Sequence, residues 1–393
     1  DVKTAKAALF PSLSFSTSQQ VVNRPYQETS SRVSGSEIIS SNSKTSYNGN
    51  YGLNASWTLY NGNKRLKTIQ QEKLNNQVAE LDVATSENNI QESIAQVYIQ
   101  ILYAAESVKV NESTLQVSIA QRDRGQELLN AGSIAKSDFA QLEAQVSTDR
   151  YQLVTAQATL EDYKLQLKQL LELDGENEMN IYLPALSDEN VLAPLPTKKD
   201  VYIRALSLRP EIEASKLNVE ASELGIGIAK SSYLPTISLS AGIGTNHTSG
   251  SDFTFGEQVK NGWNNSIGLS VSVPIFNNRQ TKSAVQKAKL QYETSMLSLL
   301  DEQKTLYKTI EGLWLDANSA QQRYAAANEK LKSTQISYEL ISEQFNLGMK
   351  NTIELLTEKN NLLQAQQEQL QAKYMAILNM QLLKFYQGDQ LAI

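Results

Sequence analysis

The 393-residue sequence contains no cysteine and only one histidine. The absence of cysteine excludes disulfide bridges, thiolate metal sites, cysteine nucleophiles and, within these residues, an acylated N-terminal cysteine. A single histidine leaves little room for imidazole catalysis or for a multi-histidine metal site. The sequence also lacks any run of about 18 apolar residues, so it predicts no transmembrane helix. Since no nucleophile is paired with a base, we predict no enzymatic activity, no metal site and no cofactor.

The remaining composition is polar and mildly acidic. The formal net charge is −6, which argues against nucleic-acid binding. Hydrophobic residues make up 40% of the chain, below the roughly 45–50% that is usual for single-core domains. The sequence begins with Asp1 instead of Met and shows no signal peptide, so we interpret it as a processed or trimmed chain. These properties suggest an architectural function.

The two halves of the chain resemble each other. The segment around Pro11 matches the segment around Pro235 at an offset of 224 residues, and later pairs such as Gly132 and Gly348 match at an offset of 216. We therefore interpret residues 1–198 as repeat 1 and residues 199–393 as repeat 2. A helix-like segment of roughly 35 residues precedes Pro235, but Pro11 has no room for one. We expect roughly 25 residues of an equivalent helix to be missing before the start of this sequence.

Four stretches alternate apolar with polar residues, which predicts strands with one apolar and one polar face. The predicted strands cover residues ~11–19, ~47–60, ~235–246 and ~264–276. Alternation alone favours a half-buried sheet in a soluble sandwich. A length of about ten residues, the absence of charge on either face and aromatic residues near the strand ends favour membrane strands instead. The aromatic residues expected at the membrane interface are Tyr47, Tyr51, Trp57, Tyr60, Trp263 and Phe276.

Four strands are too few to close a barrel that faces lipid. The practical minimum is about eight strands, and open sheet edges are not tolerated in lipid. If these strands lie in a membrane, the chain must therefore oligomerise. Two, three or four copies would supply the required number.

Two long segments without proline, residues ~64–130 and ~279–346, predict helices. Each has about 67 residues, which corresponds to about 100 Å of helix. Heptad spacing is clear in the second segment and weaker in the first, so we predict a left-handed coiled coil. Each helix ends near a glycine and is followed by a return helix, at ~133–173 and ~352–387. A segment rich in Pro, Asp and Asn (~174–198) ends repeat 1, and a further helix (~199–233) begins repeat 2.

Three motifs resemble those of the TolC-like outer membrane efflux proteins. The first is Ala-Lys-x-x-x-Leu/Phe-Pro at Pro11 and Pro235, and the second is the stretch at 268–277 that ends in Pro-Ile-Phe-Asn. The third is Gln-Phe-Asn-Leu-Gly-Met-Lys-Asn-Thr-Ile-Glu-Leu-Leu at 344–356, with an echo at 128–140. The resemblance covers essentially the whole chain. It implies an α+β membrane protein in which three copies build a 12-stranded β-barrel that continues as an α-helical tunnel.

This resemblance also implies a function and partners. The homotrimer would be a passive exit duct in the outer membrane of a Gram-negative bacterium, extending into the periplasm, where ~174–198 would form an equatorial segment. It would serve a tripartite efflux pump or a type I secretion system. Its helix turns at Gly132 and Gly348 would dock a periplasmic adaptor (membrane fusion) protein that links it to an inner-membrane pump, while its barrel contacts outer membrane lipid. The alternative is a soluble coiled-coil scaffold with a small β-domain.

The resemblance further implies a selectivity gate near the second helix turn. Glu354 falls on the first position of an acidic ring, Lys350 replaces a gating arginine, Phe345 replaces a gating tyrosine, and Asp138 is the acidic partner on the other hairpin. Phe345 lacks the hydroxyl group that would reach Asp138, and a Lys350–Asp138 link would be a point-charge contact instead of an arginine fork. The alternative is that Asp138 and Glu354 simply stabilise helix N-termini.

Overall fold

The computed structural model describes residues 1–26, 30–34, 37–41, 44–173, 181–182, 184, 191–251 and 253–391. These residues form two compact units: Asp1–Glu80 with Ala214–Leu299 (unit 1) and Leu81–Glu213 with Leu300–Ile393 (unit 2). Each unit contains pieces of both sequence repeats. Most of the expected equatorial segment (~174–198) lies outside the described residues, because 174–180, 183 and 185–190 are not among them.

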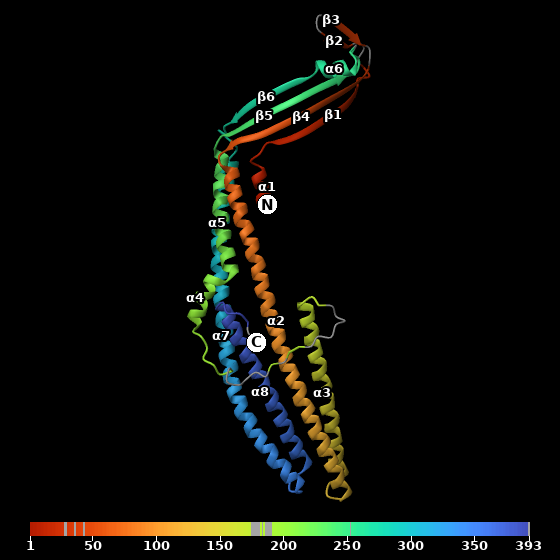
Figure 1. Cartoon of the computed structure of the whole chain (residues 1–393), viewed down its shortest axis with the longest axis vertical. Helices are drawn as coiled ribbons and strands as arrows, with labels where there is room; N and C mark the ends of the chain where they lie inside the picture. The colour runs from red at the N-terminus through yellow and green to blue at the C-terminus, as the bar shows by residue number, and fades with distance from the viewer. Residues whose placement is uncertain are drawn as a thin grey trace. The chain divides into compact units, whose positions relative to one another are not determined.

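Unit 1 is built around a four-stranded antiparallel sheet in the order β1-β4-β5-β6 (Figure 1). The strands are β1 Ser12–Asn23, β4 Thr45–Asn61, β5 Thr236–Thr248 and β6 Asn264–Ser272. A separate hairpin pairs β2 Ser30–Ser34 with β3 Glu37–Ser41, and the short helix α6 Phe255–Asn261 contacts β5. The sheet leaves β1 and β6 as its two edges.

The strand register places the alternating residues on separate faces of this sheet. On one face Leu13 pairs with Ala55, Trp57 with Leu239, and Leu239 with Leu269. The other face carries small polar residues, such as the pair Ser14 and Asn54. On the apolar face Leu13, Trp57 and Leu269 are exposed in the single chain, and Leu269 has 65% of its surface accessible. Each chain therefore presents an uncovered apolar face.

Two local features of the sheet differ from the prediction. The strand predicted to run to residue ~276 ends at Ser272, because Pro274 has no N–H to donate to the ladder. The register between β4 and β5 shifts between Thr58 and Tyr60. This bulge pairs Tyr60 with Ile237, and so moves Tyr60 onto the apolar face.

The helices repeat at a constant offset. α2 Lys64–Asn130 and α7 Gln280–Asn346 each contain 67 residues, and α3 Lys136–Leu170 and α8 Thr352–Tyr386 each contain 35. Every bound in the second set lies 216 residues after its counterpart. Gly132 and Gly348, which end the long helices, share a φ of 73°. In each case the N–H of the next residue bonds to the carbonyl five positions back, which is a Schellman stop.

The helix predicted at ~199–233 is interrupted. It consists of α4 Lys198–Leu208, α5 Pro210–Lys230 and a 3₁₀ turn, Ser231–Tyr233. Arg209, between α4 and α5, is extended with φ −73° and ψ 124°. Pro210 causes the break, because proline disfavours the helical conformation in the residue before it and suits the first position of a new helix.

The core of unit 2 lies where its helices pack together. One cluster joins α2, α7 and α8 through residues such as Leu102, Tyr324 and Ile377. A second cluster joins α4, α5, α7 and α8 through residues such as Val201 and Leu383. The hairpins α2–α3 and α7–α8 turn at the same end of this unit (Figure 1). Among the described residues, no helix combines sufficient length with sufficient apolar content to cross a bilayer.

Candidate functional site

Glu354 lies in the first turn of α8, directly after the α7–α8 turn. Its backbone N–H donates to the Asn351 side chain at 2.9 Å, and its own carboxylate accepts from the Asn351 N–H at 3.2 Å. The Lys350 ammonium is 2.6 Å from the same carboxylate. The hydrogen bond from Lys350, with that from Asn351, lowers the pKa of Glu354 below 4.5. The acid is therefore ionised at neutral pH, and a cation on its own chain offsets its charge.

The other two predicted gate residues are placed separately. Asp138 accepts a hydrogen bond from the Ala135 N–H at 3.4 Å, within its own helix start. Phe345 is buried, with 3% of its surface exposed. The ion pairs found in the described residues do not include one between Lys350 and Asp138. Lys350 therefore pairs with Glu354, whereas Asp138 accepts a hydrogen bond at the start of its own helix and Phe345 is buried.

The two helix turns are open at their tips. A Cβ atom added to Gly132 or Gly348 would meet no heavy atom within 4 Å. Around Gly348, Leu347 is 75% exposed, Met349 71% and Ile353 61%. The second turn therefore presents three large apolar side chains without cover in the single chain.

A buried polar cluster, which was not predicted from the sequence, lies on α2, α3 and α8 away from these turns. It consists of Ser118 on α2, Asp149 on α3 and Lys359 on α8, each at most 3% exposed. The Lys359 ammonium donates to both the Ser118 hydroxyl and one Asp149 oxygen. The Ser118 hydroxyl donates to that same oxygen at 2.5 Å. The second Asp149 oxygen accepts from the Gln145 amide at 2.9 Å.

This cluster takes two full charges out of water. Burial lowers the pKa of Lys359, and the hydrogen bond and negative charge of Asp149 oppose that shift. A signal for the cluster exists in the sequence. Asp149 continues the buried spacing of Leu142 and Val146 on α3, and Lys359 follows Leu355 on α8 at the same kind of interval. Charged residues of opposite sign at heptad positions that face a neighbouring helix are candidates for a buried ion pair.

A second buried cation, Arg209, occupies the break between α4 and α5. Its guanidinium is 2.8 Å from Glu211 and 3.4 Å from Glu92, and it lies 4.3 Å from the ring centre of Tyr386. Burial raises the pKa of Glu92, and Arg209 counteracts part of that shift. Burial, with the nearby charge of Glu92, also raises the pKa of Tyr386 to about 12.

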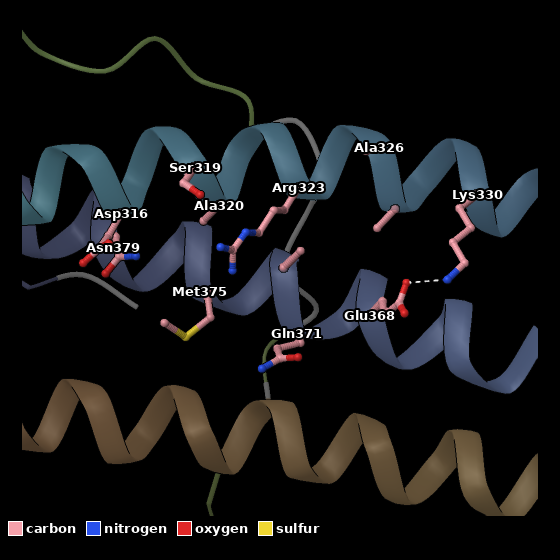
Figure 2. Close-up of a pocket in the computed structure, with 12 residues that line it drawn as sticks. Asp316, Ser319, Ala320, Arg323, Ala326, Lys330, Glu368, Gln371, Met375 and Asn379 are labelled. Atoms are coloured by element: carbon pink, nitrogen blue, oxygen red, sulfur yellow. Dashed lines mark hydrogen bonds and ion pairs between the residues drawn. The ribbon is translucent and has the colours of Figure 1, made fainter.

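A groove of about 620 Å³ runs between α7 and α8 (Figure 2). Its floor is made of small side chains, including Ala320, Ala327 and Ala372. The ion pair between Lys330 and Glu368, at 2.7 Å, spans one end of the groove. Among the described residues, no three His, Cys, Asp or Glu side chains come together as a metal site would require.

The aromatic residues expected at the membrane interface are mostly exposed. The exposed members are Tyr47, Trp57, Trp263 and Phe276, whereas Tyr51 and Tyr60 are half-buried. Two of them also anchor local structure. The Tyr47 hydroxyl donates to the Gln19 side chain at 2.6 Å, and the Trp57 indole donates to the Leu9 carbonyl at 2.7 Å.

Solved structures with the same fold include a transmembrane channel and an outer membrane protein. The chain matches the crystal structure of CusC with a TM-score of 0.80 and 19% identity, over 99% of this chain and 86% of that one. It matches the outer membrane protein VceC of Vibrio cholerae with a TM-score of 0.77 and 16% identity, over 100% of this chain and 90% of that one. These matches confirm the predicted fold of paired long helices and a four-stranded antiparallel sheet.

Two proteins of similar sequence are also outer membrane proteins. The chain is 24% identical to the outer membrane efflux protein BepC of Brucella suis over 290 residues, which is 73% of this chain and 60% of that protein. It is 23% identical to the outer membrane protein TolC of Escherichia coli over 311 residues, or 77% of this chain and 62% of that protein. The family model described as "Outer membrane efflux protein" matches residues 1–172 and 201–388. The chain therefore belongs to the outer membrane efflux protein family.

Proposed function

We propose that the chain is one subunit of a passive exit duct in the outer membrane of a Gram-negative bacterium. The observation that carries this proposal is the unfinished sheet of unit 1. It has an uncovered apolar face and two edge strands, β1 and β6, whose outer backbone groups have no partner strand within the described sheet. In lipid such edges are costly, because no water is available to satisfy the backbone groups. Pairing β6 of one copy with β1 of the next removes both edges.

Three copies give the duct its proposed size. Twelve strands exceed the minimum of about eight for a closed membrane barrel, and six helical hairpins then form the tunnel wall. Membership of the efflux protein family supports this duct over the soluble scaffold. The duct performs no chemistry and uses no cofactor, because transport energy comes from a partner.

The partners proposed for this duct are a periplasmic adaptor protein and an inner-membrane pump. The open helix turns support this assignment, since Leu347, Met349 and Ile353 offer an apolar contact around Gly348. At the first turn, a Cβ added to Gly132 would meet no heavy atom within 4 Å. An adaptor that covers these side chains removes apolar surface from water, which favours binding.

Glu354 is proposed as the selectivity residue at the periplasmic end. Threefold symmetry would bring three copies of its carboxylate around the tunnel axis and favour cations. Lys350 pairs with Glu354 in each chain and reduces the negative charge of the ring. Asp138 and Phe345 support the turn instead, by capping the start of α3 and by packing in the interior.

The experiment is to measure ion selectivity of the purified protein in a planar bilayer. Glu354→Gln should reduce the preference for cations and the block by divalent cations, and Lys350→Met should increase both. Glu127→Gln, which changes an exposed carboxylate on the other hairpin, serves as the control and should leave selectivity unchanged. If both turn variants keep wild-type selectivity, Glu354 acts only as a helix cap and the gate assignment is wrong.

A further inference from the structure

The four strands of unit 1 meet their helices at the same end of the sheet. Thr236, the first residue of β5, pairs with Asn61 at the end of β4 and with Ser272 at the end of β6. β1 begins opposite Ser56, close to that end of β4. The short helix α1 Val2–Ala7 precedes β1, α2 follows β4, α5 and its 3₁₀ turn precede β5, and α7 follows β6. The four connections between sheet and helices therefore lie together (Figure 1).

These four connections are strongly basic. Residues 2–11, 61–71, 224–235 and 277–292 contain ten Lys and Arg residues but no Asp or Glu. The whole chain has the opposite balance, with 36 basic and 42 acidic residues. Among the described residues, none of the ten cations takes part in an ion pair. We call this set the basic collar: Lys3, Lys6, Lys64, Arg65, Lys67, Lys230, Arg279, Lys282, Lys287 and Lys289.

Only two members of the basic collar hold the local structure together. Arg65 donates to the Ala8 carbonyl at 2.7 Å and also to the Thr58 carbonyl. The Lys67 ammonium donates to the Gly227 carbonyl at 3.4 Å. The other eight side chains are exposed to solvent. Packing within the chain therefore does not explain why so many cations gather here.

Their position is also unfavourable for the long helices themselves. The N-terminus of a helix is the positive end of its dipole, where acids stabilise and cations destabilise. α3 and α8 follow this rule, with Asp138 and Glu354 in their first turns. α2 and α7 have no acid in the first turn, and α2 begins instead with Lys64 and Arg65. A negative charge supplied from outside the chain would offset this cost.

Each connection also places an aromatic residue between its strand and the cations. The aromatic residue lies three or four positions from a cation on the helix side, in the pairs Phe10 and Lys6, Tyr60 and Lys64, Tyr233 and Lys230, and Phe276 and Arg279. Aromatic side chains concentrate at the boundary of the bilayer hydrocarbon. Basic residues just beyond that boundary attract anionic headgroups. The order of apolar face, aromatic residue and cation therefore matches hydrocarbon, interface and phosphate layer.

We propose that the basic collar binds the phosphate groups of anionic phospholipids in the leaflet that faces the periplasm. This assignment rests on the proposed duct function, which places the apolar sheet in the outer membrane and the helices on its periplasmic side. The lipid phosphates supply the negative charge that the chain itself lacks at these four connections. Every copy in the duct contributes the same cations, so bound lipid fixes the depth of the barrel in the membrane.

The first test measures binding of a fluorescent phosphatidylglycerol to the purified protein in detergent micelles. The collar variant neutralises four exposed cations of unit 1: Lys6→Gln, Lys230→Gln, Lys282→Gln and Lys287→Gln. It should weaken binding at least about tenfold, because each cation near an anionic lipid surface adds to the attraction. The control variant removes the same charge from exposed cations of unit 2: Lys136→Gln, Arg150→Gln, Lys304→Gln and Lys308→Gln. Equal loss in both variants, or no loss in the collar variant, overturns the proposal.

The second test separates the charge of the collar from its fold and from a free anion site. Arginine at the same four collar positions keeps the charge and should retain wild-type binding, whereas a loss as large as that with glutamine contradicts the proposal. Labelled phosphatidylcholine, which has a phosphate but no net charge, should bind wild type and collar variant alike. Inorganic phosphate should displace the phosphatidylglycerol no better than chloride at equal ionic strength. Specific displacement by phosphate would mean isolated anion sites and would exclude the lipid assignment.

A third readout separates the collar from the duct itself. Conductance and ion selectivity are measured in planar bilayers for the wild type, the collar variant and the control variant. If the wild type does not conduct but only the collar variant loses phosphatidylglycerol binding, the duct function fails while the lipid site stands. If the protein conducts and both variants bind the lipid as the wild type does, the duct stands and the lipid site is wrong. Altered ion selectivity with unchanged lipid binding would place these cations inside the duct and overturn the proposal.

Discussion

Replacement of Arg209 by methionine tests whether its buried ion pairs hold the break between α4 and α5 in place. Arg209 has a side chain only 7% exposed, and it connects the break between α4 and α5 to α2 and α8. Its two carboxylate partners, Glu92 and Glu211, are 19% and 20% exposed. Arg209→Met fills a similar volume but removes the cation that both acids face.

The expected cost follows from the burial of these partners. Breaking a buried ion pair from one side costs about 3–5 kcal/mol, because the remaining charge is left uncompensated. At about 1.4 kcal/mol for each factor of ten, local opening becomes roughly two to three and a half orders of magnitude more frequent. Hydrogen exchange of the amides in α4, the start of α5 and the end of α8 reports this opening directly. Those amides should exchange faster by that factor.

Two controls identify the cause of the change. Lys109→Met removes an exposed pair with Glu106, which should cost at most about 1 kcal/mol. The triple variant Arg209→Met, Glu92→Gln, Glu211→Gln leaves no buried charge and should recover most of the lost protection. If Arg209→Met exchanges no faster than Lys109→Met, the buried ion cluster does not hold the helix break in place and the reasoning is refuted.

Three further predictions concern other parts of the chain. Gly312→Ala should raise stability by about 0.5–1 kcal/mol, since its Cβ meets nothing within 4 Å. Gly125→Ala should gain less or lose stability, because its Cβ would collide with the buried Leu142 side chain of α3; thermal melting compares the two variants. Glu354 has a lowered pKa, so its stabilising contribution is present above pH 4.5 and is lost as the pH falls through the folded-state value; the difference in melting temperature between the wild type and Glu354→Gln should shrink on acidification, and a constant difference would contradict it. Leu269→Lys places a charge on the apolar face of the sheet, at a cost of about 2–4 kcal/mol in lipid, and should reduce recovery in the outer membrane fraction, whereas Ser270→Lys on the other face should not.

Much of the fold was predictable from the sequence because the relevant signals are periodic. The offset of 216 residues, found first in the match of Gly132 with Gly348, recurs in the bounds of all four helices of the two hairpins. The alternation around Trp57 and Leu269 correctly separated the two faces of the sheet. Periodicity reports which side of an element is apolar, and one sequence is enough to read it.

Features that depend on a single residue were less accessible. Pro210 breaks the helix predicted at ~199–233, and Pro274 ends β6 early, although both prolines are visible in the sequence. The bulge that turns Tyr60 onto the apolar face has no obvious signal, because it depends on how β4 pairs with β5. Local exceptions of this kind override a regular pattern without changing its period.

The candidate site was the least predictable part. Counting from the turn glycine places Asp138 and Glu354 at equivalent positions, six residues after Gly132 and Gly348, but it does not show which side chains Lys350 meets. Lys350 instead finds Glu354 one helical turn away. The Asp149–Lys359 pair requires the packing of three helices to bury both charges, and a heptad pattern alone does not distinguish such a pair from two solvated residues.

The mass of the purified protein tests the central claim most directly. Because the open-edged sheet of one chain closes only with further copies, light scattering in detergent should give a protein mass three times the 43.6 kDa of the chain, with no stable species once detergent is removed. A monodisperse 43.6 kDa species in detergent-free buffer would contradict the duct.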